Sequence, residues 1–273
     1  MTVHRPFEFT IGPLTVTGFG IAVLLAFLVA QVISQRELER RGHNADAIPD
    51  LVLAAVIGGL LGAKLYYVIL TRDINNLFTR GGFVFWGGLM GGIVAVIAMI
   101  RVKKLNVWRI ADVAGIAIAA AYAVGRTGCW AVGDDYGRPW NGFLAVSFPE
   151  GAPPSTAAVM ERDFGIPIPD GVSPDTVLSV YPTQLFETAL AMVMFFILWH
   201  MRKHRHAEGW LFGVYMVLAG IERFLIEFLR AKDDRFFGGL TMAQLIALAF
   251  VVGGFMWMRA RSRVQGEARG IYA

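Results

Sequence analysis

The stretch VAGIAIAAAYAVGRTGCWAVGDDYGRPW, residues 113–140, joins an uncharged apolar run to a segment dense in charge and glycine. Its last sixteen residues hold two arginines, two adjacent aspartates, four glycines and the only cysteine of the chain. The apolar half can lie in lipid, whereas charged side chains are costly there. The stretch therefore predicts a membrane span that ends at a polar surface.

The composition of the whole chain points to lipid as its main solvent. Hydrophobic residues make up 56% of the 273 residues and charged residues only 17%, and the mean hydropathy is +0.54. Soluble domains carry about 25% charged residues, and a helix needs about 20 apolar residues to span a bilayer. We predict an all-α integral membrane protein, one membrane domain over 1–273 with seven transmembrane helices. The expected spans are 14–33, 51–70, 83–100, 110–132, 182–200, 209–229 and 238–258.

The basic residues predict the orientation of these spans. If the N-terminus is outside, 14 of the 25 Lys and Arg residues fall in inside segments and 9 in outside segments. This asymmetry follows the positive-inside rule, so we expect the N-terminus out and the C-terminus in. The pI of about 9.4 then reflects topology, and nucleic acid is not an expected partner.

One long break separates the fourth and fifth spans. Residues 133–180 are rich in Pro, Gly and Asp and lie on the outer face in this topology. Loops of this length are usually functional or disordered. We expect a small extracytoplasmic head or lid, with a plain tether as the alternative.

Ionisable residues within the spans mark a candidate site, because at membrane depth they face a partner or a wet cavity. Arg223, Glu227 and Arg230 are spaced four and three apart and share one helical face. They form either an internal ion pair or an anion site, and arginine suits phosphate because its fork can donate two hydrogen bonds. Gln184 and Glu187 share a face at the start of the fifth span.

The opening stretch adds a further arginine to this candidate site. Arg126 lies at the end of the fourth span. Glycine-rich backbone with free N–H groups beside an arginine can form an anion-binding concavity. Arg126 and Arg223, converging from two spans, would form a phosphate clamp at the outer interface. The sequence shows no metal-ligand spacing, nucleotide loop or serine-elbow motif. We therefore expect neither a metal nor a cofactor.

Six motifs together resemble one protein family. They are GPLTVTGFGI (12–21), GAKLYYV (62–68), GGFVFWGGLMGG (81–92), GRTGCWAVGDDYGR (125–138), YPTQLFE (181–187) and ERFLIEFLR (222–230). Over nearly its whole length the chain resembles prolipoprotein diacylglyceryl transferases. The resemblance implies a bacterial cytoplasmic (inner) membrane enzyme, active on the extracytoplasmic side. Such an enzyme moves a diacylglyceryl group from phosphatidylglycerol to the lipobox cysteine thiol of a preprolipoprotein and releases glycerol phosphate.

The resemblance also implies which residues form the site. The positions that bear on catalysis are Arg126, Arg223, Glu227, Asp134, Trp86 and Cys129. The positions that bind phosphatidylglycerol are Arg126, Gly137, Arg138, Gln184, Glu187, Arg223, Arg230, Lys64 and Phe19. Arg126 and Arg223 would hold the lipid phosphate and stabilise the leaving group. Glu227, Asp134 and Glu187 would orient the arginines and the head group.

Several family positions carry other residues in this chain. Trp86 stands where the family has the histidine expected to act as base, and Cys129 and Asp134 stand where it has asparagine and glutamate. Phe19 replaces a tyrosine and Lys64 an arginine. The thiol proton is then expected to pass to Asp134 or to water. Two alternatives stay open: a paralogue that uses another acceptor, with Cys129 as a candidate nucleophile, and a non-catalytic phospholipid-binding protein.

Overall fold

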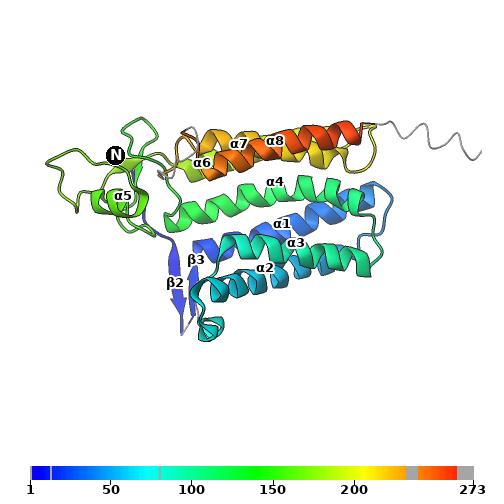
Figure 1. The fold of residues 1–273 in the computed structure, drawn as a ribbon, viewed down its shortest axis with the longest axis horizontal. Helices are drawn as coiled ribbons and strands as arrows, with labels where there is room; N and C mark the ends of the chain where they lie inside the picture. The colour runs from blue at the N-terminus through cyan, green and yellow to red at the C-terminus, as the bar shows by residue number, and fades with distance from the viewer. Residues whose placement is uncertain (1, 13, 80, 232–238, 263–273) are drawn as a thin grey trace, which may run out of the picture. The chain divides into compact units, whose positions relative to one another are not determined.

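Seven long helices dominate the computed structural model of the chain, which describes residues 2–12, 14–79, 81–231 and 239–262 (Figure 1). An eighth, α5 (Ala157–Phe164), is short. The long helices are α1 (Gly18–Arg40), α2 (Ile48–Thr71), α3 (Phe85–Val102), α4 (Val107–Val132), α6 (Thr183–Met201), α7 (Trp210–Ile226) and α8 (Met242–Ala260). Each corresponds to one expected span, although the start of the last expected span, residue 238, lies outside the described residues.

The long helices confirm a helical membrane protein. Within the described residues six of them, α1, α2, α3, α4, α6 and α8, are long and apolar enough to cross a bilayer. The expected number was seven. The remaining helix, α7, has 17 residues and is shorter than the other six, of which the shortest, α3, has 18.

The N-terminal segment departs from the all-α expectation. Residues 14–17, assigned to the first span, form strand β3 (Leu14–Thr17), which pairs antiparallel with β2 (Glu8–Ile11). Thr15, Val16 and Thr17 favour a strand because their side chains branch at Cβ. Gly12 lies in the connecting turn with φ +59°, a conformation that glycine adopts at little cost. Helix α1 therefore begins at Gly18.

Contacts divide the chain into two compact units, 30–114 and 1–29 with 115–273, and each is described by itself. In unit 30–114, α2 and α3 pack with their backbones in contact. A Cβ on Gly91 would lie 2.8 Å from the Cα of Gly62 and would overlap the carbonyl oxygen of Gly58. Small residues allow this approach in lipid. The 3₁₀ helix η1 (Ile74–Phe78) follows α2.

In the second unit, α7 packs against both α6 and α8. Residues 133–180 fold between α4 and α6 and include α5 and strands β4 (Val146–Ser147) and β5 (Ser179–Val180). Strand β1 (Thr2–Val3) completes a three-stranded sheet in the order β1-β4-β5. The hydrophobic core of residues 133–180 includes Phe148, whose ring stacks on that of Tyr136 with centroids 5.3 Å apart. We call residues 133–180 the head.

Candidate functional site

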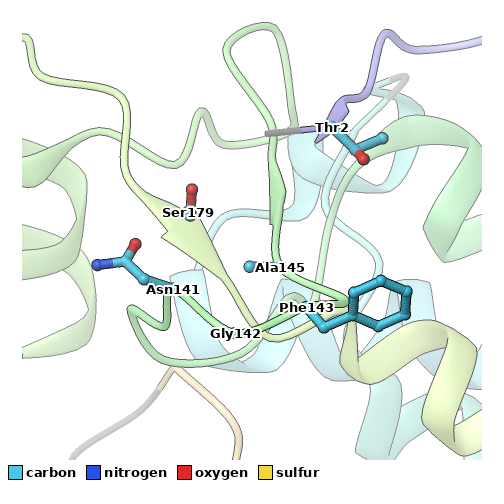
Figure 2. A pocket seen from close by; sticks show the side chains of 6 residues that line it. All are labelled: Thr2, Asn141, Gly142, Phe143, Ala145 and Ser179. Carbon is cyan, nitrogen blue, oxygen red and sulfur yellow. The ribbon is translucent and has the colours of Figure 1, made fainter.

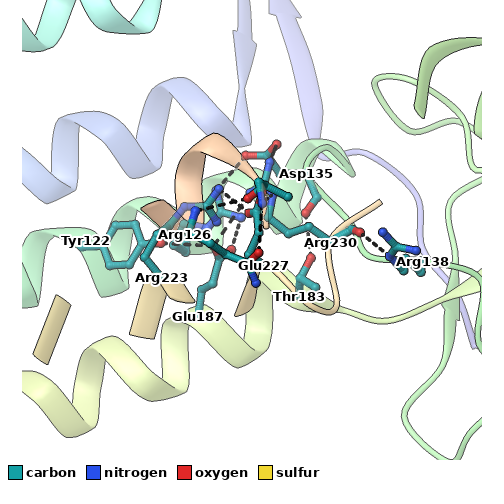
Figure 3. Close-up of polar contacts among 11 residues, drawn as sticks. Tyr122, Arg126, Asp135, Arg138, Thr183, Glu187, Arg223, Glu227 and Arg230 are labelled. Atoms are coloured by element: carbon teal, nitrogen blue, oxygen red, sulfur yellow. Dashed lines mark hydrogen bonds and ion pairs between the residues drawn. The ribbon is translucent and has the colours of Figure 1, made fainter. Parts of the chain in front are cut away.

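A cluster of ion pairs lies in the second unit, where α4 and α7 end and α6 begins (Figure 3). Three guanidiniums and three carboxylates make up the cluster, and Figure 3 shows their side chains directed toward one another. Its members are Arg126, Asp135, Glu187, Arg223, Glu227 and Arg230. Three of the six, Arg126, Glu187 and Glu227, are buried, and such charges are retained only when they are paired. We call this set the arginine cluster.

Arg126, at 8% exposure, is the deepest arginine of the cluster. It forms an ion pair with Glu187 on α6. Its Nη1 lies 2.9 Å from Asp135 Oδ2 and 3.2 Å from the sulfur of Cys129. Its Nε is buried and has no hydrogen-bond partner within the described part of the chain. One buried donor of Arg126 therefore stays available.

Arg223 is held from the start of α8. Its Nη2 lies 2.6 Å from Glu227 Oε2, and Thr241 donates a 3.0 Å hydrogen bond to Glu227 Oε1. Thr241 is the N-cap of α8, so the position of Glu227 depends on where that helix begins. Nη1 of Arg223 is buried and, among the residues described, has no hydrogen-bond partner.

Arg230 links the carboxylates of three segments. Its Nη2 lies 2.6 Å from Asp135 Oδ1, and its Nη1 lies 3.8 Å from Glu187 Oε1. Its Nε lies 4.0 Å from Glu227 Oε2. Asp135 therefore bridges Arg126 and Arg230 with one oxygen on each.

The motif YPTQLFE positions the loop that carries Asp134 and Asp135. Thr183 Oγ1 donates a 2.7 Å hydrogen bond to the carbonyl of Asp135. The amide nitrogen of Gln184 donates to the carbonyl of Asp134. Thr183 and Gln184 are fully buried at the start of α6. Gln184, predicted to bind lipid, thus holds the loop backbone.

Gly137 and Arg138 position Arg230. Gly137 and Arg230 form an antiparallel bridge, and a Cβ on Gly137 would lie 2.6 Å from the Cβ of Tyr181 and overlap the carbonyl of Leu229. Only glycine permits this approach. Nε of Arg138 donates a 3.2 Å hydrogen bond to the carbonyl of Arg230. Both residues therefore act on the cluster through the backbone.

The two adjacent aspartates differ in their environment. Burial, and then the negative charge of Asp135, raise the pKa of Asp134 to about 6. Burial acts in the same direction on Asp135, but Arg230 and Arg126 outweigh it and lower the pKa of Asp135 to about 2. The family resemblance implied that Asp134 orients the arginines. In the structure the carboxylate between the arginines belongs to Asp135, which the sequence analysis did not single out.

The ligand atoms of Cys129, Asp134 and Asp135 lie within 4.8 Å of one another, which is close enough to hold a metal ion. The sequence spacing had predicted no metal site. Arg126 contacts both the Cys129 sulfur and the Asp135 carboxylate. A cation would therefore be placed against a guanidinium, so this charge arrangement favours an anionic ligand over a metal.

Two further residues of the second unit, Tyr122 and Glu222, approach the arginine cluster and were not among the predicted site residues. Tyr122 donates a 3.2 Å hydrogen bond to Glu187 Oε1. Its only signal in the sequence is a position one turn before Arg126 on α4. Glu222 is buried, and its Oε1 has no hydrogen-bond partner in the described segments.

Three predicted site residues have other surroundings. Lys64, in unit 30–114, is buried, and its ammonium group donates to the carbonyls of Thr79 and Gly81 and to the Thr79 hydroxyl. Trp86, in the same unit, is exposed in the first turn of α3. Phe19 lies on α1 in the other unit, is 43% exposed, and its Cα would meet a Cβ on Gly128 at 3.2 Å.

The head contains a separate cavity of about 290 Å³. It lies beside β5 (Figure 2) and is lined by Thr2, Asn141, Gly142, Phe143, Ala145 and Ser179. None of these residues was predicted for the site, and none belongs to the arginine cluster. This cavity is therefore distinct from the arginine cluster.

The fold and the cluster define a class: helical membrane proteins with arginine–carboxylate ion pairs at the helix ends. The chain belongs to the family described as prolipoprotein diacylglyceryl transferase, whose model matches residues 6–260. It is 28% identical over 271 residues to a phosphatidylglycerol–prolipoprotein diacylglyceryl transferase of Clostridium tetani, covering 96% of this chain and 100% of the relative. An enzyme with the same description from Vibrio vulnificus is 30% identical over 268 residues, covering 93% and 90%.

Proposed function

We propose that the protein transfers the diacylglyceryl group of phosphatidylglycerol to the lipobox cysteine thiol of a preprolipoprotein. The observation that carries this proposal is a pair of buried guanidinium donors, Arg126 Nε and Arg223 Nη1, for which the described residues provide no hydrogen-bond partner. A buried donor without a partner costs about 1–3 kcal/mol, and more when it is charged. Such donors are retained where a ligand satisfies them, and a lipid phosphate does so.

The reaction forms one bond and breaks one. The peptide sulfur attacks the terminal glyceryl carbon of the diacylglyceryl group, the bond from that carbon to the phosphate oxygen breaks, and glycerol phosphate leaves with the electron pair. Arg126 and Arg223 stabilise the charge that builds on the departing phosphate. Preorganised donors of this kind contribute roughly 10²–10³-fold each to a rate. Glu187 and Glu227 hold the two arginines for this role.

The thiol of the acceptor must lose its proton before attack. A free cysteine has a pKa of about 8.5, so a base increases the thiolate fraction. Asp134 suits this role because burial raises its pKa to about 6 and its Oδ1 is buried without a hydrogen-bond partner among the described residues. A base whose pKa lies near the working pH is the most effective. Trp86, in the family's histidine position, has no group that could accept the thiol proton. Cys129 lies beside Arg126 in the site.

The remaining predicted site residues support the binding of phosphatidylglycerol in two ways. Gly137, Arg138 and Gln184 place the loop and Arg230. Phe19 offers an exposed aromatic surface to lipid. We assign Lys64 the task of holding residues 79–81, since its ammonium hydrogen bonds go to that loop.

The proposal includes the topology of a seven-span protein of the bacterial inner membrane. We count α7 as a span because it packs against α6 and α8, both of which are long enough to cross. The excess of Lys and Arg in the inside segments places the N-terminus and the head outside. The active face then meets preprolipoproteins after their export.

The test is transfer to a peptide by the full-length protein in detergent micelles. Labelled phosphatidylglycerol and a peptide with a lipobox cysteine are added, and the mass of the peptide is measured. We expect a diacylglyceryl mass gain on the cysteine that Arg126→Ala abolishes. The control is Arg162→Ala, which removes an exposed head arginine whose guanidinium pairs with its neighbour Asp163.

Two results would contradict the proposal. Tight phospholipid binding without transfer to any thiol would make the protein a non-catalytic phospholipid-binding member of the fold. Transfer of the lipid group to a different acceptor, with none to the lipobox cysteine, would make it a paralogue with another substrate.

A further inference from the structure

Asp135 is the carboxylate that lies between two arginines of the cluster (Figure 3). Its Oδ2 lies 2.9 Å from Arg126 Nη1 and its Oδ1 lies 2.6 Å from Arg230 Nη2. The side chain of Asp135 is 40% exposed, whereas those of Arg126 and Arg230 are 9% and 19% exposed. Asp135 is therefore the most accessible member of this trio.

Among the described residues, the three arginines of the arginine cluster are matched by its own three carboxylates, and the carboxyl groups of Asp134 and Glu222 lie nearby. Arg126, Arg223 and Arg230 are matched by Asp135, Glu187 and Glu227. A lipid phosphate adds a further negative charge, and like charges repel strongly where water is scarce. Withdrawal of one carboxylate relieves this repulsion and frees a further guanidinium donor for the phosphate.

Asp135 is the carboxylate best placed to withdraw. Glu187 and Glu227 are at most 4% exposed and project from α6 and the end of α7, so neither has room to move. Asp135 instead sits in a loop, in the left-handed conformation with φ +53°, two residues after Gly133 with φ +71°. Residues other than glycine adopt this region at a cost, and aspartate tolerates it better than most.

The bridging carboxylate also has the form of the expected ligand. A carboxylate and a phosphodiester each present two anionic oxygens on one atom, and guanidinium forks bind both in the same manner. The two Asp135 oxygens each contact a different arginine, as the two non-bridging oxygens of a phosphodiester would.

We propose that Asp135 is a resident anion of the site: its carboxylate occupies the phosphate position between Arg126 and Arg230, yields it to phosphatidylglycerol, and returns to expel glycerol phosphate. The identity of the ligand rests on the proposed function. Asp135 thereby prevents loosely held anions from occupying the arginines. Only a ligand with further contacts, such as one to Arg223, displaces it.

The test compares anion binding with and without the Asp135 charge. Asp135→Asn keeps the size of the side chain and removes its charge, whereas Asp135→Glu keeps the charge. We expect Asp135→Asn to lower the Kd for phosphatidylglycerol by about ten-fold, the scale of a charge-assisted contact. The Kd for glycerol phosphate should fall too, so that product inhibition of transfer increases. For Asp135→Glu, the Kd for phosphatidylglycerol should stay within about two-fold of that of the wild type.

The matched control for charge removal is Asp163→Asn. Asp163 is a head aspartate whose carboxylate pairs with the exposed Arg162, outside the arginine cluster. It should leave the Kd for phosphatidylglycerol unchanged. An Asp135→Asn protein that binds phosphatidylglycerol as the wild type does, or more weakly, would overturn the proposal, because Asp135 would then only hold the arginines in place.

A measurement on the wild type covers the case in which Asp135→Asn does not fold. In an experimental structure with phosphatidylglycerol bound, we expect the Asp135 carboxylate to have left Arg126. A carboxylate that still bridges Arg126 and Arg230 beside the bound lipid would overturn the proposal.

Failure of this inference and failure of the proposed function give different results. A wild type that binds phosphatidylglycerol but transfers nothing refutes the transferase function, and the binding comparison still decides the role of Asp135. Transfer by the wild type together with unchanged or weaker lipid binding by Asp135→Asn refutes the role of Asp135 alone.

Discussion

Thr241, the N-cap of α8, donates a 3.0 Å hydrogen bond to Glu227, whose other carboxylate oxygen lies 2.6 Å from Arg223. The Thr241 hydroxyl also accepts the backbone N–H of Gln244, and the Gln244 side chain accepts the N–H of Thr241. One residue thus completes a helix cap and positions a carboxylate. The start of α8 therefore controls the orientation of a guanidinium on α7.

We expect Thr241→Val to lower both stability and transfer, because the cap and the Glu227 contact are lost together. Loss of a cap costs about 0.5–2 kcal/mol. The turnover number should fall several-fold, and Thr241→Ser should restore it. Thr156→Val, which removes the corresponding cap of α5 in the head, should lower stability without changing turnover. Equal effects of the two valine variants on turnover would show that Thr241 acts only as a cap.

Arg126→Lys tests whether charge alone suffices at the deepest arginine. Lysine keeps the charge but has no planar fork with which to contact Glu187 and an anion together. We expect kcat/KM for transfer to fall by about 100-fold or more, whereas Arg162→Lys should match the wild type. A lysine variant that retains most of the activity would contradict the assigned geometry.

The raised pKa of Asp134 predicts how kcat/KM falls at acidic pH, along the acidic limb of the pH profile. Burial, followed by the charge of Asp135, raises its pKa to about 6, so the carboxyl is protonated below that pH and is then not able to accept a proton. The kcat/KM of the wild type should therefore rise as the pH increases through about 6. In Asp134→Asn the remaining activity should lack this limb. Persistence of the limb in the variant would assign it to another group.

Gly137→Ala should displace Arg230 through the backbone. The new Cβ would lie 2.6 Å from the Cβ of Tyr181 and overlap the Leu229 carbonyl, and overpacking of this kind costs about 1–3 kcal/mol. Thermal unfolding should show the loss, and KM for phosphatidylglycerol should rise. Gly125→Ala is the control for stability, since no heavy atom lies within 4 Å of its added Cβ. A Gly137→Ala protein as stable as the wild type would contradict the close approach.

The Lys64→Met variant distinguishes between two roles of Lys64, namely holding residues 79–81 and contacting the lipid. If Lys64 holds residues 79–81, the variant leaves the carbonyls of Thr79 and Gly81 without their donor, and stability should fall by about 1–3 kcal/mol. KM for phosphatidylglycerol should change little. A strong rise in KM at unchanged stability would show instead that Lys64 contacts the lipid.

The helices were largely predictable because the bilayer imposes a simple rule on the chain. Every backbone polar group in hydrocarbon must be satisfied within its own segment, so long apolar runs become helices. Residues 14–17 were not predictable from such a rule. Their composition suits a span, and their strand depends on pairing with Glu8–Ile11 across a turn.

The sequence by itself determined the residue types of the site: arginines and carboxylates near the ends of apolar segments, with glycines beside them. Only the tertiary structure decided which of two adjacent aspartates meets the arginines. Asp134 and Asp135 are chemically identical, and no local pattern distinguishes them. Hydrogen bonds from Thr183 and Gln184, about fifty residues further along, hold the loop so that Asp135 lies between Arg126 and Arg230. Such contacts form only when α6 packs beside the end of α4, which is why the sequence alone did not specify them.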